Sequence, residues 1–167
     1  MVLVGAAGAG KSTFARRWFD PAEILSSDGL RELISGDPAD QSVSRAAFAR
    51  LHRELGIRLR AGRLTVVDAT NVGHAARRSL VARALWADRP AVAIVLDLPA
   101  EAVHARNRAR TERVVEPLVV DRQLAALRRT LGRGQLHDEG FSAVHRLGST
   151  IELDAVRLIR LGMPGSG

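Results

Sequence analysis

A glycine-rich segment near the start of the chain has the residue types and spacing of a phosphate-binding loop. Residues 5–13 read Gly-Ala-Ala-Gly-Ala-Gly-Lys-Ser-Thr, which fits the pattern G-x-x-x-x-G-K-[ST]. An apolar stretch precedes the segment and a stretch with helical spacing follows it, which is the context that the pattern needs. The glycines would turn backbone N–H groups toward phosphate oxygens, and the helix N-terminus adds partial positive charge. The alternative is a glycine-rich strand-to-helix turn without a ligand.

Lys11 and Ser12 carry the chemistry expected of this loop. Lys11 would reach the β- and γ-phosphate oxygens of ATP, and the Ser12 hydroxyl would ligate Mg²⁺. The surrounding cradle would be formed by Gly8, Ala9, Gly10 and Thr13. Lys11 is the single lysine among 25 basic side chains. This excludes the guanine-reading Asn-Lys-x-Asp motif of a GTPase and the second lysine of a nucleotidyl-transferring ligase, so a small phosphotransferase fits better.

An aspartate follows the second expected strand, in the run Ser26-Ser27-Asp28-Gly-Leu-Arg31. Beside the phosphate loop of a parallel sheet, this carboxylate could align an acceptor hydroxyl for in-line attack on the γ-phosphate. Asp28 would then be a general base or a hydroxyl orienter. Arg31 lies one helical turn on and could hold an acceptor phosphate through two N–H donors. The alternative is that Asp28 only caps the helix and Arg31 is solvated.

Two further groups of polar residues are candidates for the same site. Asp68 and Asn71 follow a third apolar run, and they would either position the acceptor or Arg31 or form a polar turn that caps the next helix. The segment 104–113 reads His-Ala-Arg-Asn-Arg-Ala-Arg-Thr-Glu-Arg, where small phosphotransferases carry a mobile lid. Its Arg110 and Arg113 could stabilise charge on the transferred phosphoryl group. The alternative is a charge run on a solvated helix.

The elements that position these residues alternate between short apolar strands and amphipathic helices. Strands are expected at residues 1–4, 24–27, 64–67, 91–96 and 143–147, and helices at 42–61, after Pro117 up to Gly132, and at 151–160. This alternation predicts an α/β fold with a mostly parallel five-stranded sheet, helices on both faces and ligands at the carboxyl ends of the strands. Trp86 and Phe48 are expected in the core, so base-stacking platforms are not expected.

Composition limits the classes of protein further. The 167 residues fit one domain, for which we expect the bounds 1–161, a lid at about 104–116, and a linker or artificial tail at 162–167. The absence of cysteine excludes disulfides and predicts a reducing, cytoplasmic compartment. No apolar run approaches the roughly 20 residues that a membrane helix needs. The net charge of +7 favours an anionic partner such as nucleic acid, although Arg-for-Lys usage across helix faces is the alternative.

Taken in order, the motifs resemble the 5′-polynucleotide kinase domain of bacterial polynucleotide kinase-phosphatases, which heal RNA ends. The resemblance covers essentially the whole chain. The matching stretches are the phosphate loop with Phe14 and Ala15, Ile-Leu-Ser-Ser-Asp-Gly-Leu-Arg, Asp40-Gln41, Leu-Thr-Val-Val-Asp-Ala-Thr-Asn-Val, Arg-Asn-Arg-Ala-Arg-Thr-Glu-Arg and the late Glu-Gly-Phe.

The resemblance implies a P-loop kinase fold and transfer of phosphate from ATP, with Mg²⁺, to the 5′-hydroxyl end of RNA or DNA. It implies that Asp28 activates the hydroxyl, that Arg31 contacts acceptor-side phosphate, and that Arg110 and Arg113 occupy lid positions. Arginine side chains would bind nucleic acid through its backbone. In the bacterial enzymes a phosphatase and a ligase domain follow the kinase. Two alternatives remain: a kinase of a small molecule or nucleotide sugar, resembling gluconate kinases or zeta toxins, and a non-catalytic, ATP-dependent RNA-binding module.

Overall fold

The computed structural model describes residues 1–111 and 113–159 and contains one parallel sheet of five strands. The strands are β1 (Val2–Val4), β2 (Ile24–Ser26), β3 (Val66–Asp68), β4 (Val92–Leu96) and β5 (Ala143–Leu147), in the spatial order β2-β3-β1-β4-β5. The predicted α/β class and five-stranded sheet are confirmed. Because all strands are parallel, their carboxyl ends lie along one edge, and the phosphate loop leaves this edge from the central strand.

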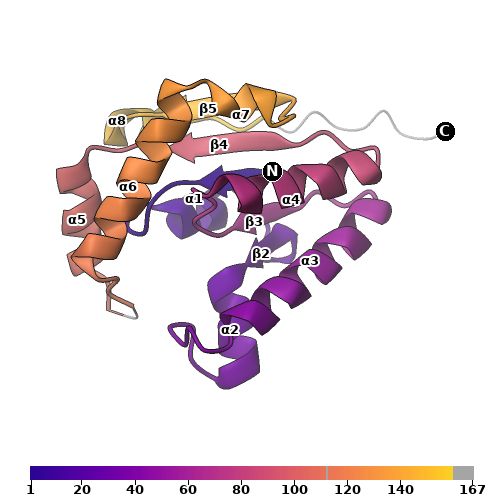
Figure 1. Ribbon diagram of the computed structural model, residues 1–167, viewed down its shortest axis with the longest axis horizontal. Coiled ribbons are helices and arrows are strands. Elements are labelled where there is room, and N and C mark those ends of the chain that lie inside the picture. Colours follow the sequence, from indigo (N-terminus) through magenta and orange to yellow (C-terminus); the bar gives the residue numbers. More distant parts are fainter. Residues whose placement is uncertain (112, 160–167) are drawn as a thin grey trace.

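Helices cover both faces of the sheet (Figure 1). They are α1 (Lys11–Trp18), α2 (Ser27–Ser35), α3 (Ser44–Arg60), α4 (His74–Trp86), α5 (Ala100–Arg108), α6 (Pro117–Gly132), α7 (Gln135–Asp138) and α8 (Thr150–Ala155), with a 3₁₀ turn at Pro21–Glu23. Within the described ranges, no helix combines the length and apolar character needed to cross a membrane.

The side chains of the central strand alternate between two cores, one on each face of the sheet. Val2 and Val4 lie in the core that contains Leu51 of α3 and Leu80 of α4. Leu3 lies in the opposite core, where the helices α1, α5, α6 and α8 contribute apolar side chains. The sheet is therefore buried on both faces, which gives the loops at its carboxyl edge a rigid base.

Most of the expected elements are present, and most of their bounds differ from the expected ones by one or two residues. The helix after Pro117 ends at Gly132 as predicted, and the fifth strand has the predicted limits. The third strand begins two residues later than expected and includes Asp68 as its last residue. The prediction of a final helix over 151–160 is wrong in extent, because α8 ends at Ala155. The expected tail at 162–167 lies outside the described residues.

The prediction that Trp86 and Phe48 lie in the core is wrong. Trp86 is 94% exposed at the last position of α4, and Phe48 is 37% exposed on α3. On α3 the buried positions are Ala47, Leu51 and Leu55, so the apolar stripe faces the sheet through smaller side chains and leaves Phe48 at its margin.

Candidate active site

The phosphate loop joins β1 to α1 and packs directly against α5. Gly8 has φ +87°, and a Cβ there would lie 2.5 Å from the carbonyl oxygen of Val103 and 3.0 Å from Cβ of Asn107. Gly10 has φ +92° and is the N-cap residue of α1. Both positions need glycine because of their backbone conformation, and Gly8 needs it also because α5 leaves no room for a side chain.

Lys11 is buried inside its own loop. Its Nζ donates hydrogen bonds to the carbonyl oxygens of Gly5 at 2.9 Å and Ala6 at 2.8 Å. Burial lowers the pKa of Lys11 from its ordinary 10.5 to about 8, and the nearby Asp68 carboxylate opposes this shift. Burial removes water from the Lys11 ammonium, and a bound phosphate would replace the lost water with a favourable charge interaction.

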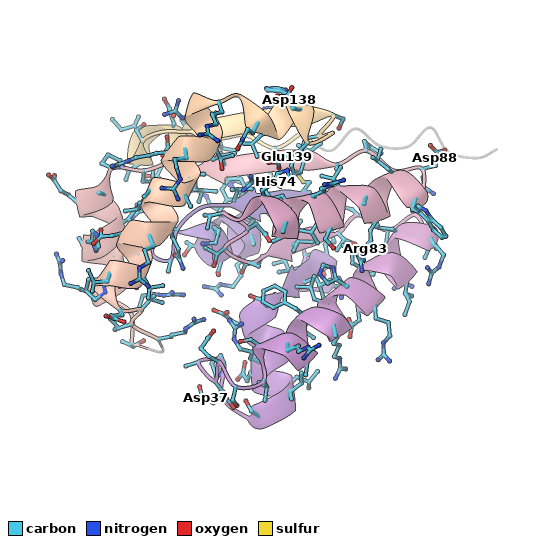
Figure 2. All side chains as sticks on the ribbon, viewed as in Figure 1. Asp37, His74, Arg83, Asp88, Asp138 and Glu139 are labelled. Carbon is cyan, nitrogen blue, oxygen red and sulfur yellow. The ribbon has the colours of Figure 1, made fainter. Side chains whose placement is uncertain are left out.

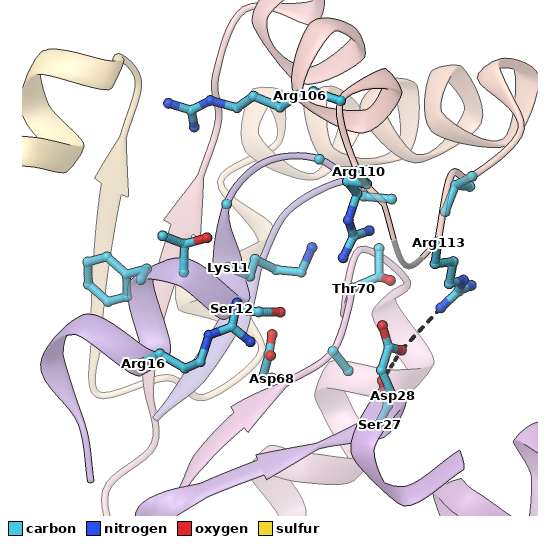
Figure 3. Close-up of a pocket in the computed structure, with 18 of the residues that line it drawn as sticks. Lys11, Ser12, Arg16, Ser27, Asp28, Asp68, Thr70, Arg106, Arg110 and Arg113 are labelled. Atoms are coloured by element: carbon cyan, nitrogen blue, oxygen red, sulfur yellow. Dashed lines mark hydrogen bonds and ion pairs between the residues drawn. The ribbon is translucent and has the colours of Figure 1, made fainter. Parts of the chain in front are cut away.

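A cavity of about 590 Å³ brings most of the predicted site residues together (Figure 3). Of the residues predicted from the sequence, those that line it are Gly8, Gly10, Lys11, Ser12, Thr13, Asp28, Asp68, Arg110 and Arg113. Ala9, Arg31 and Asn71 are not among the lining residues; Ala9 is fully buried and packs in the core. The cavity therefore joins the phosphate loop, the end of β2, the end of β3 and the expected lid.

Asp28 lies in the first turn of α2 and faces the expected lid. Its Oδ1 accepts a hydrogen bond from Nη1 of Arg113 at 3.1 Å and another from Nη2 of Arg31. The N-cap of α2 is Ser26, whose hydroxyl accepts from the N–H of Gly29. The alternative that Asp28 serves only as the helix cap is therefore wrong, and its carboxylate is available to the cavity.

Arg31 does not face the cavity. Its side chain is 5% exposed, its Nε donates to the carbonyl oxygen of Pro38 at 3.0 Å, and its Nη2 donates to Asp28. The alternative of a solvated Arg31 is thus wrong, and the expected contact with acceptor phosphate finds no support in this arrangement. The described contacts instead make Arg31 a support that fixes the Asp28 carboxylate.

Asp68 and Asn71 have different positions. Asp68 is buried, lines the cavity, and lies near Ser12 and Lys11 in Figure 3. Asn71 has φ +49°, and its Nδ2 donates to the carbonyl oxygens of Leu3 at 2.9 Å and Ala69 at 3.3 Å. Asn71 therefore shapes the turn after β3, as the polar-turn alternative expects.

The turn after β3 is tied both to the phosphate loop and to a buried ion pair. The N–H of Gly5 donates to the carbonyl oxygen of Thr70 at 3.1 Å. The guanidinium of Arg77 donates to the carbonyl oxygens of Asn71 and Val72, and it also donates to both carboxylate oxygens of Glu139 at 2.7 and 2.6 Å. Glu139 comes from the loop before β5 and lies beside the start of α4, near His74 (Figure 2).

The cavity is also lined by residues that the sequence analysis did not identify as site residues: Arg16, Arg17, Arg106, Gln123, Leu153 and Asp154. A Cβ at Gly10 would lie 3.3 Å from Nη1 of Arg106 and 3.9 Å from Cδ2 of Leu153, so these side chains flank the end of the phosphate loop. This end could hold the nucleoside part of ATP. Leu153 carried no recognisable signal, because only the fold brings α8 next to α1.

The donor set fits a magnesium nucleotide. Magnesium in kinases keeps several waters and is bound by one or two protein oxygens together with substrate phosphates. Ser12 and Asp68 supply such oxygens beside Lys11. Among the described residues no cluster of three or more His, Cys, Asp or Glu could hold a metal ion by itself.

We expect ATP affinity to fall as the pH rises above about 8, because burial lowers the pKa of Lys11 to about 8. Bound phosphates favour the ammonium and raise this pKa, so that binding above this pH must take up a proton. Affinity should weaken by up to about tenfold per pH unit in this range. Calorimetric titration with ATP at several pH values measures this change in affinity. AMP, which lacks the phosphates that Lys11 would reach, is the control, and an equal pH dependence for AMP would contradict the assignment.

Comparison with known proteins supports a kinase fold at low sequence identity. The protein is similar to a provisionally assigned kinase from Chloroflexus aurantiacus J-10-fl, with a TM-score of 0.60 and 13% identity over 92% of this chain and 91% of that one. It is also similar to a gluconokinase from Sinorhizobium meliloti 1021, with a TM-score of 0.55 and 18% identity over 92% and 83% of the two chains. A shikimate kinase from Acinetobacter baumannii gives a TM-score of 0.52 and 21% identity over 92% and 86%.

At these identities the likenesses show the fold alone, which is that of the P-loop kinases. No curated protein matches the chain significantly. A family model described as an AAA domain, AAA_33, matches residues 1–133. This match includes the phosphate loop, Asp28, Asp68 and both arginines of the expected lid, and the chain therefore belongs to the AAA_33 family of AAA domains.

Proposed function

We propose that the protein transfers the γ-phosphate of ATP, with Mg²⁺, to a hydroxyl group of an acceptor bound at Asp28. The observation that carries this proposal is the placement of Asp28 and Lys11 in one cavity, beyond the carboxyl ends of β2 and β1, the two strands that flank β3. Asp28 does not cap its helix, and two arginines fix its carboxylate. A carboxylate held opposite a phosphate loop is suited to orient a hydroxyl and to accept its proton.

Different residues of this chain would carry out different parts of the reaction. The backbone N–H groups of the phosphate loop and Lys11 would bind the β- and γ-phosphates, and Ser12 would ligate Mg²⁺, which neutralises charge on the phosphates when bound. The described hydrogen bonds of the Asp28 carboxylate use Oδ1, and none from the described residues uses Oδ2. Oδ2 is thus the oxygen to which an acceptor hydroxyl would donate. Arg110 would stabilise charge on the transferred group.

A small hydroxylated molecule is our first candidate acceptor. The gluconokinase and the shikimate kinase that share this fold are named for such acceptors. The cavity of about 590 Å³ also falls in the size range of small-molecule sites, roughly 300–1,000 Å³.

The 5′-hydroxyl end of RNA or DNA is the second candidate acceptor. One observation favours it: Arg110 and Arg113 line the cavity beside Asp28, in a chain of net charge +7. Such a surface would bind a nucleic acid through its phosphates, with strong salt dependence and little sequence preference. The ordered motif set described above points the same way.

A transfer assay with γ-labelled ATP separates these possibilities. The protein is incubated with Mg²⁺ and, in parallel, gluconate, shikimate, a panel of other sugars, a 5′-hydroxyl oligonucleotide and its 5′-phosphorylated counterpart. Label on a small molecule supports the first candidate, and label on the hydroxyl oligonucleotide alone supports the second. Binding of ATP and RNA without transfer to any acceptor would contradict the proposal and indicate a non-catalytic module.

A further inference from the structure

Asn107, the second-to-last residue of α5, forms a reciprocal pair of hydrogen bonds with one peptide unit. Its Nδ2 donates to the carbonyl oxygen of Val115 at 2.7 Å, and its Oδ1 accepts from the N–H of Val115 at 3.1 Å. The residue is 1% exposed. Only one orientation of the amide satisfies both partners, so the side chain fixes the backbone of Val115 relative to the end of α5.

The two arginines of the expected lid lie between these two fixed points. The N–H of Arg110 donates to the carbonyl oxygen of Asn107 at 3.4 Å. Arg113 is two residues before Val115, and its guanidinium reaches Oδ1 of Asp28 at 3.1 Å. Both arginine side chains point toward the cavity from this short loop (Figure 3).

Both ends of this loop are also fixed to the phosphate loop. At its start, α5 packs so closely on Gly8 that a Cβ at that glycine would lie 3.1 Å from the backbone nitrogen of Asn107. Beyond its end, Gln123 of α6 accepts a hydrogen bond from the N–H of Ala7 at 2.8 Å. The arginines therefore lie between two helices, α5 and α6, that both contact the phosphate loop.

From this arrangement we propose that Asn107 is a positioning residue, which holds Arg110 and Arg113 in register with the phosphate loop and Asp28. It touches no substrate itself. This inference rests on the proposed kinase function for its effect on catalysis, but the structural part, the attachment of Val115 to the end of α5 by the Asn107 amide, does not depend on the acceptor.

The first test replaces Asn107 with aspartate, which keeps the size of the side chain. A carboxylate oxygen then faces the carbonyl oxygen of Val115, so the loop loses its closure while the phosphate loop and Lys11 are unchanged. We expect kcat to fall by about 10²-fold, the order that a misplacement of about 1 Å produces, with little change in KM for ATP. Gln135→Glu on α7 adds the same charge away from the cavity and is the control.

A double-mutant cycle distinguishes positioning from general destabilisation. In a background that carries both Arg110→Ala and Arg113→Ala, the change Asn107→Asp should lower kcat much less than it does alone, because both arginines that it positions are already missing. Additive losses in kcat would overturn the proposal. Asn107→Ala removes both hydrogen bonds without burying a charge, and it decides the question if the aspartate variant does not fold.

A second readout needs no acceptor and no kinase activity. Trypsin cleaves after arginine, and the loop presents such bonds after Arg108, Arg110 and Arg113. We expect mass spectrometry of limited digests to show faster cleavage at these bonds in the folded Asn107 variants than in the wild-type protein and the Gln135→Glu control. Equal cleavage rates would overturn the proposal. Faster cleavage of the Asn107 variants, together with a wild-type protein that shows no transferase activity, would support the structural role of Asn107 and contradict only the proposed function.

Discussion

Replacing Asp28 with asparagine is expected to lower the rate of phosphoryl transfer by about 10²–10⁴-fold, the usual contribution of a general base. Asparagine keeps an oxygen for the guanidinium groups of Arg31 and Arg113, which now donate to Oδ1 of Asp28. It cannot accept the proton of an acceptor hydroxyl. Because Ser26 caps α2, the helix should persist, and the loss should appear in kcat rather than in unfolding.

The measurement is the turnover of Asp28→Asn with ATP, Mg²⁺ and whichever acceptor the transfer assay identifies. Asp138→Asn, on the exposed surface of α7, makes the same chemical change outside the cavity and should leave turnover unchanged (Figure 2). Binding of ATP to the Asp28 variant should stay close to that of the wild-type protein. Full activity of Asp28→Asn would refute the role assigned to this carboxylate.

Replacing Arg77 with methionine is expected to lower the free energy of unfolding by about 3–5 kcal/mol, the usual cost of breaking a buried ion pair from one side. The Arg77 side chain is fully buried and that of Glu139 is 3% exposed. The substitution leaves the Glu139 carboxylate without its bidentate partner. It also removes the donors to the carbonyl oxygens of Asn71 and Val72, on the turn that follows the cavity residue Asp68.

Urea denaturation measures this effect. Arg78→Met changes the neighbouring exposed arginine of the same helix and should shift the unfolding free energy by about 0.5 kcal/mol or less. Combining Arg77→Met with Glu139→Leu removes both charges and should recover part of the loss, because no buried carboxylate then remains unpaired. An Arg77→Met protein as stable as the wild type would show that the pair contributes nothing.

Local patterns predicted the elements whose signals are local. The phosphate loop carries its own motif, and the apolar strands and the Pro117 and Gly132 limits of α6 follow from runs and helix-end residues. The exposure of Trp86 was not predicted, because the sequence alone does not show whether a neighbouring element covers an aromatic residue at the end of a helix. The final helix was predicted too long for a similar reason: nothing in residues 151–160 marks its end at Ala155.

Local patterns did not predict the side-chain contacts in and around the site. The sequence indicated that Asp28 and Arg31 share a helical face, but their mutual hydrogen bond leaves Arg31 turned toward Pro38 rather than toward a ligand. Arg77 and Glu139 are 62 residues apart, and no sequence motif around either residue indicates that the two form a pair. Such a pair forms only when the fold packs α4 against the segment between α7 and β5, so no local rule predicts it.

The placement of Lys11 allows the nucleotide site to be labelled selectively with an amine-reactive reagent. An amine reacts with acylating reagents only when it is deprotonated, and the pKa of about 8 makes the Lys11 amine reactive at mildly alkaline pH. The arginines remain protonated there and do not compete. Since no other lysine side chain exists in the chain, the extent of side-chain acylation would report directly on the nucleotide site, and bound ATP should protect it.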